Sequence, residues 1–323
     1  MIRRHLLALP ALALPLLAAA ARAQTTPRPA RLGFIASSGN PDRVAYRGFR
    51  ARLQELGWTE GVSLATSFHN PGRVDAVTLR ETALAALAGQ PDLVVVDGRL
   101  ATQALAAATR TVPIITMLGL DPVETGLIQS LARPGGNITG VTLFSDLLNV
   151  KRMEMLMEIA PGARRIGIVS TNPAGAIEVA ASQVAARGLS PQRIVINGAP
   201  LIEASLSPAA LAGIDALIVL SDSVLDSWPA RVVASVAAAG KPVIYPERQY
   251  TLAGGLLSYG PDVDTPFRRL AELVDQVLRG ANPATIPFER VSRFELVANA
   301  RAAAAIGLAL PASILALADE VIE

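Results

Sequence analysis

Small polar and acidic residues follow several short apolar runs of the sequence, and these residues are the best placed to bind a solute. Ser37 and Ser38 follow the first such run and precede a helix expected over residues 43–56. Hydroxyl groups and exposed backbone N–H groups ahead of a helix can bind a carboxylate or another anion. We therefore predict a ligand contact at these serines. The open alternative is that Ser38, Asn40 or Asp42 only caps the helix.

Two further apolar runs in the first half of the chain lead to the same kind of position. The first ends at Asp97 and Gly98, and the second is followed by Leu118 and Asp121. We predict ligand contacts at these four residues, because a carboxylate there can accept a hydrogen bond from a ligand ammonium or hydroxyl. A helix N-terminus would use the same carboxylate as a cap. Capping is the stronger interpretation for Asp121, because an Asp-Pro pair is typical of a helix start, here with an end expected near Arg133.

The second half of the chain repeats the pattern after three more runs, where the predicted contacts are Asn172, Ser221, Asp222, Tyr245 and Glu247. A serine hydroxyl can donate to a ligand carboxylate, and an aspartate can accept from an ammonium or hydroxyl. The alternative for Asp222 is that it caps a helix expected over residues 224–238. The alternative for Tyr245 is that its ring packs in the core.

The residue inventory argues against an enzyme. The chain has no cysteine and two histidines, His5 and His69, so thiol catalysis, disulfides and Cys-ligated metals are excluded. A histidine-based metal site or acid–base pair is disfavoured. The sequence also lacks a Gly-x-Gly-x-x-Gly or Walker phosphate loop and a Gly-x-Ser-x-Gly elbow. We expect a binding protein with no cofactor, no metal and no catalytic residues, and a secreted α/β enzyme is the remote alternative.

Residues 1–23 have the three parts of an export signal: a basic start, an apolar core over 6–20, and a small-residue cleavage site at 21–23. The apolar core is too short to span a bilayer and contains two prolines, which disfavours a membrane anchor. We expect cleavage after Ala23 and release into the periplasm. Loss of the three arginines of this segment takes the net charge from +2 to −1, so no nucleic-acid-binding surface is expected.

An internal repeat predicts the architecture. Apolar runs alternate with alanine-rich helical stretches, which is typical of parallel sheets covered on both faces. Three segments recur in the same order: 31–37 as 165–171, 91–97 as 214–220, and 112–115 as 241–244. The fold class expected from this repeat is α/β, with two similar doubly wound parallel-sheet lobes. Ligands of open α/β sheets bind outside the carboxyl ends of the strands, so the solute is expected between the lobes.

The segment 121–141, DPVETGLIQSLARPGGNITGV, resembles a signature of bacterial ABC-transporter substrate-binding proteins of the tryptophan/tyrosine type. The resemblance extends over nearly the whole chain after the signal, through the segments 48–58, 91–94, 160–165 and 279–287. It implies the type I periplasmic-binding-protein fold, in which the chain crosses between two hinged lobes three times. The crossings are expected near Gly140, Ser258 and Val291. The first lobe would then hold residues 28–140 plus 258–290, and the second 141–257 plus 291–323.

The resemblance also implies a function. The protein would be a periplasmic carrier that closes on a small molecule, with an amino acid or an aromatic or carboxylate compound as the candidates. Its expected partners are an ABC permease and that permease's ATPase subunit. It would contact the inner membrane only through the permease and would act as a monomer. A periplasmic receptor feeding a membrane sensor or chemoreceptor is the alternative. At residues 174–176 and 222–223 the chain departs from the residues common in the family, so the solute is not identified.

Overall fold

The computed structural model describes residues 28–36, 44–72, 75–119, 121–143, 145–171, 175–222, 224–262 and 264–323. The predicted export signal over residues 1–23 lies outside the described residues, as do the predicted contacts Ser37, Ser38 and Asn172. Within the described ranges, no helix is both long enough and apolar enough to cross a membrane.

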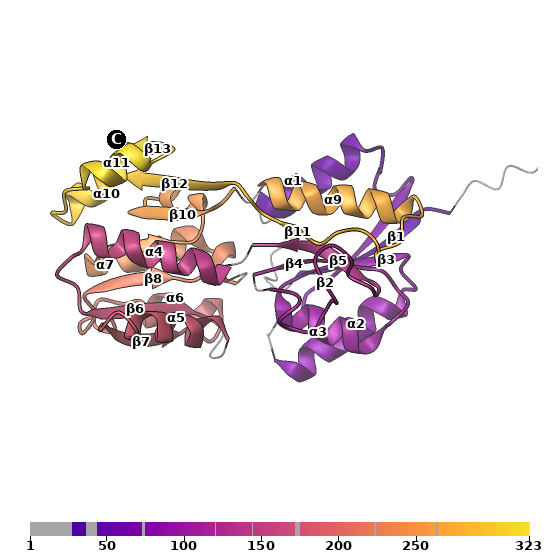
Figure 1. Ribbon diagram of the computed structural model, residues 1–323, viewed down its shortest axis with the longest axis horizontal. Coiled ribbons are helices and arrows are strands. Elements are labelled where there is room, and N and C mark those ends of the chain that lie inside the picture. Colours follow the sequence, from indigo (N-terminus) through magenta and orange to yellow (C-terminus); the bar gives the residue numbers. More distant parts are fainter. Residues whose placement is uncertain are drawn as a thin grey trace, which may run out of the picture.

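The first lobe is a parallel sheet with helices on both faces (Figure 1). Its strand order is β11-β5-β4-β3-β1-β2. Helices α1 and α9 pack on one face of this sheet, and α2 and α3 pack on the other. The strands are β1 (Ala30–Ile35), β2 (Leu64–His69), β3 (Leu93–Asp97), β4 (Ile114–Leu118), β5 (Ile138–Thr142) and β11 (Glu289–Arg290). The helices are α1 (Val44–Glu55), α2 (Ala76–Ala88), α3 (Arg99–Ala108) and α9 (Asp264–Leu278).

The second lobe contains a larger sheet, in the order β13-β12-β10-β9-β8-β6-β7. Its strands are β6 (Arg165–Ser170), β7 (Ser190–Val195), β8 (Ala216–Val219), β9 (Val243–Tyr245), β10 (Leu257–Pro261), β12 (Phe294–Asn299) and β13 (Glu320–Ile322). Its helices are α4 (Ser145–Ile159), α5 (Ala176–Ala185), α6 (Ile202–Ser205), α7 (Pro229–Ala239), α8 (Arg248–Leu252), α10 (Ala300–Ala305) and α11 (Ala312–Leu317), with 3-10 turns η1 (Ala199–Leu201) and η2 (Leu225–Ser227). All pairs from β7 to β10 are parallel, and β12 is antiparallel to β10. The predicted fold class is therefore confirmed.

The central strands form because continuous apolar runs suit a sheet that is covered on both faces. All five residues of β3, with the sequence LVVVD, are buried. The edge strands β2 and β7 are different, because most of their residues are partly or fully exposed. Their sequences, LATSFH and SPQRIV, carry no apolar run that would distinguish them from loops. The central strands are consequently recognisable in the sequence, whereas these two edge strands are not.

The internal repeat is visible in individual hydrogen bonds. In the first lobe, the carboxylate of Asp92 accepts a hydrogen bond from the backbone N–H of Arg31 at 2.8 Å. In the second lobe, the carboxylate of Asp215 accepts from the N–H of Arg165, also at 2.8 Å. Each aspartate precedes the third strand of its lobe in chain order, β3 or β8, and ties it to the start of the first, β1 or β6, which is its neighbour in the sheet. The matched segments found in the sequence therefore occupy equivalent places in the two sheets.

The chain passes between the two sheets three times: between β5 and α4, between β10 and α9, and between β11 and β12. The crossings were expected near Gly140, Ser258 and Val291. Strand β5 continues in the first sheet to Thr142, and β10 continues in the second sheet to Pro261. The first two changes of sheet therefore come a few residues later than the sequence analysis placed them.

One predicted helix is wrong. Between β4 and β5 the described residues form turns, where the sequence analysis placed a helix from Asp121 to about Arg133. The start is as expected, because Asp121 Oδ1 accepts a hydrogen bond from the N–H of Val123 at 2.7 Å. The turn then ends at Gly126, whose φ of 70° is left-handed. Asp121 therefore caps a single turn, because a left-handed residue cannot continue an α-helix.

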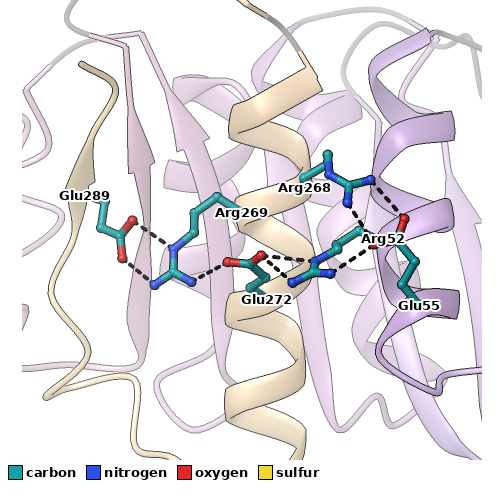
Figure 2. A network of polar contacts seen from close by, with 6 residues as sticks. All are labelled: Arg52, Glu55, Arg268, Arg269, Glu272 and Glu289. Carbon is teal, nitrogen blue, oxygen red and sulfur yellow. Dashed lines mark hydrogen bonds and ion pairs between the residues drawn. The ribbon is translucent and has the colours of Figure 1, made fainter. Parts of the chain in front are cut away.

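Helix α9, which returns from the second lobe, is fixed in the first lobe by a ladder of charges (Figure 2). Six side chains of alternating sign form this charge ladder across α1, α9 and β11: Glu289, Arg269, Glu272, Arg52, Glu55 and Arg268. Arg269 makes two hydrogen bonds to Glu289, at 2.8 and 2.6 Å, and these raise its pKa above the ordinary value. Because the contacts are bidentate and form a continuous network, we expect them to stabilise the packing of α9 on the first lobe, whereas isolated exposed ion pairs contribute little to stability.

Candidate functional site

The carboxyl ends of the parallel strands of one lobe point toward the other lobe. Strand β5 ends at Thr142, and the next helix, α4, begins at Ser145 in the second lobe. In the reverse direction, β10 ends at Pro261 and α9 begins at Asp264 in the first lobe. Because β5 and β10 are parallel to their neighbours β4 and β9, the carboxyl ends of all four strands face the other lobe (Figure 1). We call the described residues that directly follow β3, β4, β6, β8 and β9 the interlobe face.

Asp97 and Gly98 lie at the end of β3, as predicted, but the carboxylate is used inside the lobe. Asp97 is 2% exposed, and Tyr46 Oη of α1 donates a hydrogen bond to its Oδ2 at 2.5 Å. Gly98 has a φ of 85° and forms the N-cap of α3, a conformation that favours glycine. The carbonyl of Gly98 accepts from the Thr102 hydroxyl at 2.8 Å. Asp97 thus holds α1 against β3, and its buried carboxylate lies inside the first lobe.

The residue after this glycine, Arg99, reaches from the first lobe to the second. Its Nη1 donates a hydrogen bond to Gln103 Oε1 at 3.1 Å. Its Nη2 lies 3.2 Å from the position that a Cβ atom would take on Gly175, the N-cap of α5 in the second lobe. Gly175 has a φ of 67°, so both its conformation and the nearby guanidinium favour glycine there. Arg99 was not among the predicted contacts, because its approach to Gly175 depends on how the two lobes face each other.

Leu118 and Asp121 follow β4 at the same edge. Leu118 is 1% exposed, and its carbonyl accepts a hydrogen bond from the N–H of Leu143 at 2.8 Å. It therefore lies beside the first connection between the lobes. Asp121 is half-buried, and its carboxylate makes the turn contact described above.

In the second lobe, Asp222 joins two loops of the interlobe face. Its Oδ2 accepts hydrogen bonds from the backbone N–H of Thr171 at 2.8 Å and from the Thr171 hydroxyl at 2.6 Å. Its Oδ1 accepts from the N–H of Val224 at 3.0 Å. The helix expected over 224–238 is divided here, since the 3-10 turn η2 precedes α7, which begins at Pro229. The geometry therefore gives Asp222 a capping role at this turn. Ser221 beside it is half-buried.

Tyr245 and Glu247 lie at the end of β9 but are covered by protein. Tyr245 is 1% exposed and its ring stacks on Tyr250, with ring centroids 4.9 Å apart. Burial raises the pKa of Tyr245 above the ordinary value. Glu247 is 4% exposed and lies close enough to Arg152 of α4 for its charge to influence the arginine's pKa. In this conformation both residues sit behind the interlobe face, in the core of the second lobe.

Arg152 lies at the centre of a buried polar group that includes Asp226 and Glu247. Arg152 was not among the residues predicted from the sequence. It is 1% exposed and donates hydrogen bonds to the carbonyl of Tyr259 at 2.7 Å and to Asn149 Oδ1 at 2.7 Å. A third bond reaches the carbonyl of Pro246 at 3.2 Å. Burial lowers its pKa to about 10, while the charges of Asp226 and Glu247 oppose the shift. The guanidinium therefore stays charged at neutral pH. It ties α4 to β10 through Tyr259 and to the end of β9 through Pro246.

The predicted residues within the described chain all lie at or just behind the carboxyl ends of strands. The structure brings together Asp97 and Gly98 with Arg99 on one side, and Ser221 and Asp222 on the other. Most of the carboxylates already have protein partners, which leaves ligand contact at each of these residues a prediction.

Comparison with known proteins shows which family the chain belongs to. A family model described as "ABC transporter substrate binding protein" matches residues 37–322. The chain belongs to this family. A curated member, the tyrosine-binding protein of Clostridioides difficile (strain R20291), is 29% identical over 261 residues, which cover 79% of this chain and 74% of that protein. The description of the family and the name of this relative both refer to binding proteins.

Solved structures of similar proteins have the same architecture. The ABC domain from Streptococcus pneumonia in complex with L-Trp is 26% identical, covers 91% of this substrate-binding protein and 100% of its own chain, and gives a TM-score of 0.77. A conserved domain protein from Vibrio cholerae is 24% identical, covers 90% of this chain and 99% of its own, and gives a TM-score of 0.79. The likeness therefore extends over both lobes.

Proposed function

We propose that this protein is the solute-binding component of an ABC importer, which captures an amino-acid-like small molecule between its two lobes. The observation that carries the proposal is the opposition of two repeated sheets whose carboxyl ends point toward each other across three chain connections. Open α/β sheets bind ligands at these ends. The L-Trp in a similar structure and the name of the tyrosine-binding relative favour an amino acid as the solute.

The connections between the lobes would act as the hinge. Short segments at the ends of elements can absorb the backbone rotation of domain closure, while the packed lobes move as rigid bodies. We take the three connections after β5, β10 and β11 as the lobe boundaries. The closed form would dock on a permease, whose ATPase subunit would supply the energy of import. The protein would be exported by residues 1–23 and would act as a periplasmic monomer.

A ligand panel tests this function. We expect the purified chain lacking residues 1–23 to be stabilised by at least one of L-tyrosine, L-tryptophan and L-phenylalanine in a thermal-shift measurement. A ligand at 100 times its dissociation constant adds about 2.7 kcal/mol to the native state, which raises the melting temperature of a protein of this size by several degrees.

The panel also contains a sugar, a nucleoside and a short peptide as solutes of other chemistry. Stabilisation by one of these alone would retain a carrier and replace the amino acid. An unchanged melting temperature with every member, confirmed by calorimetry, would contradict the proposal.

A further inference from the structure

Arg99 is placed at the interlobe face by the end of β3. Gly98 turns the chain at a φ of 85°, and α3 begins at the next residue, so the Arg99 side chain leaves the first lobe at the edge that faces the second. Its guanidinium lies beside Gly175, ahead of α5. It is half-buried, so part of its hydration is already lost. A cation between two lobes loses more hydration when the lobes approach each other, and that loss is costly unless an anion accompanies it.

Several other arginines of the chain are paired with carboxylates. Arg28, Arg165, Arg193 and Arg231 each form an ion pair, with N–O distances between 2.6 and 2.8 Å. Among the residues that the structure describes, no carboxylate forms an ion pair with Arg99, whose hydrogen-bond partner is the neutral amide of Gln103. Arg99 is thus a cation at the interlobe face that retains donor groups for another acceptor.

We propose that Arg99 is a specificity-determining residue that binds a carboxylate group of the solute, so that the carrier selects solutes that bear one. This inference rests on the proposed function. A planar guanidinium presents paired N–H donors that match the two oxygens of a carboxylate, which gives both affinity and orientation. A carboxylate there would supply the missing anion when the lobes close. Gly175 leaves room for the guanidinium on the side of the second lobe.

The competing explanation is a latch. In that case Arg99 would stabilise the closed form through the segment near Gly175, whatever the solute. The two explanations differ in one measurable respect. A carboxylate contact weakens only when the ligand carries a carboxylate, whereas a latch weakens the binding of every ligand by the same factor.

The test is calorimetric titration of Arg99→Gln with matched ligands. The probes are L-tyrosine and L-tryptophan, each beside its carboxamide, L-tyrosinamide and L-tryptophanamide, which keep the amine and the ring but lack the negative charge. We expect the wild-type protein to bind the free amino acids more tightly than the amides. Arg99→Gln should lose roughly 10- to 150-fold in affinity for the free amino acids, as expected for one charge-assisted contact, and should bind the amides as the wild type does.

The chain offers a matched control at the opposite end of the same helix. Arg110 is exposed just beyond the C-terminus of α3, so Arg110→Gln makes the same change of charge away from the interlobe face. The Arg110→Gln variant should bind the amino acids and their amides with the same affinities as the wild type. Arg99→Lys keeps the charge without the paired donors and should lose less than Arg99→Gln, which provides a second variant if the glutamine protein does not fold.

Four results would overturn the inference. Equal losses for the amino acids and their amides would show a latch, and unchanged affinity for the amino acids would show no role. A wild-type protein that binds only uncharged solutes from the panel would refute carboxylate selection and leave the carrier function intact. A wild-type protein that binds no solute would refute the proposed function, and the inference would fall with it.

Discussion

Replacing Arg152 with methionine is expected to lower the free energy of unfolding by about 3–5 kcal/mol. The guanidinium is 1% exposed and supplies hydrogen bonds to the carbonyls of Tyr259 and Pro246. Methionine fills much of the same volume, but it donates no hydrogen bond and carries no charge. Asp226 and Glu247 would then keep buried negative charge without the guanidinium. Loss of one member of a buried charged group leaves its partners uncompensated, which is the main cost.

The neighbouring residue is the control for this substitution. Lys151 lies on the same helix, is about half exposed and pairs with Glu154 at 3.3 Å. Lys151→Met should change stability by less than about 1 kcal/mol, because exposed ion pairs contribute little. Urea unfolding followed by circular dichroism measures both variants. Equal stabilities for Arg152→Met and the wild type would show that the buried polar group does not stabilise the second lobe.

The substitutions Gly140→Ala and Gly260→Ala are expected to destabilise the protein by about 3 kcal/mol or more each. A Cβ atom on Gly140 would lie 1.9 Å from the carbonyl oxygen of Thr116, and one on Gly260 would lie 1.8 Å from that of Pro246. Both obstacles are backbone atoms, which cannot move as a flexible side chain would. The two glycines occupy β5 and β10, which hold equivalent places in the two sheet orders and lead directly into the connections between the lobes.

Two other glycines provide controls. Gly136 and Gly162 have no positive φ, and a Cβ atom on either would meet nothing within 4 Å. Gly136→Ala and Gly162→Ala should therefore be neutral or slightly stabilising, since alanine restricts the unfolded chain. The comparison is made by denaturant midpoints at constant slope. If all four alanine variants unfold at the same urea concentration, the close approach at β5 and β10 is not a constraint on the fold.

The repeat was predictable because both copies retain local features that have a direct structural role. The pairs Arg31 with Asp92 and Arg165 with Asp215 stand at strand starts, where one carboxylate holds the next strand's backbone in register. The central strands are apolar throughout because both faces of each sheet are covered. Patterns of this kind are written in consecutive residues, so the fold class followed from the sequence.

The site was less predictable because its determinants lie far apart in the chain. The turn ends at Gly126 because that residue adopts a left-handed backbone conformation. The Asp121-Pro122 pair is typical of a helix start, so the sequence favoured a longer helix there. Arg152 looks like an ordinary exposed residue of a helix until the strands around it are in place. Arg99 gains its position through Gly175, which belongs to the other lobe. Contacts between lobes leave no periodic signal in the sequence.

The central claim, closure of two lobes on a solute, is tested most directly by a distance between them. The chain contains no cysteine, so a variant with Ala107→Cys on α3 and Ala185→Cys on α5 would carry spin labels at these two exposed positions alone. Electron–electron double resonance gives the distribution of distances between the labels. We predict that saturating L-tyrosine or L-tryptophan, whichever stabilises the protein, shifts this distribution to shorter distances and makes it narrower. A distribution that stays unchanged while calorimetry shows the ligand bound would contradict the account.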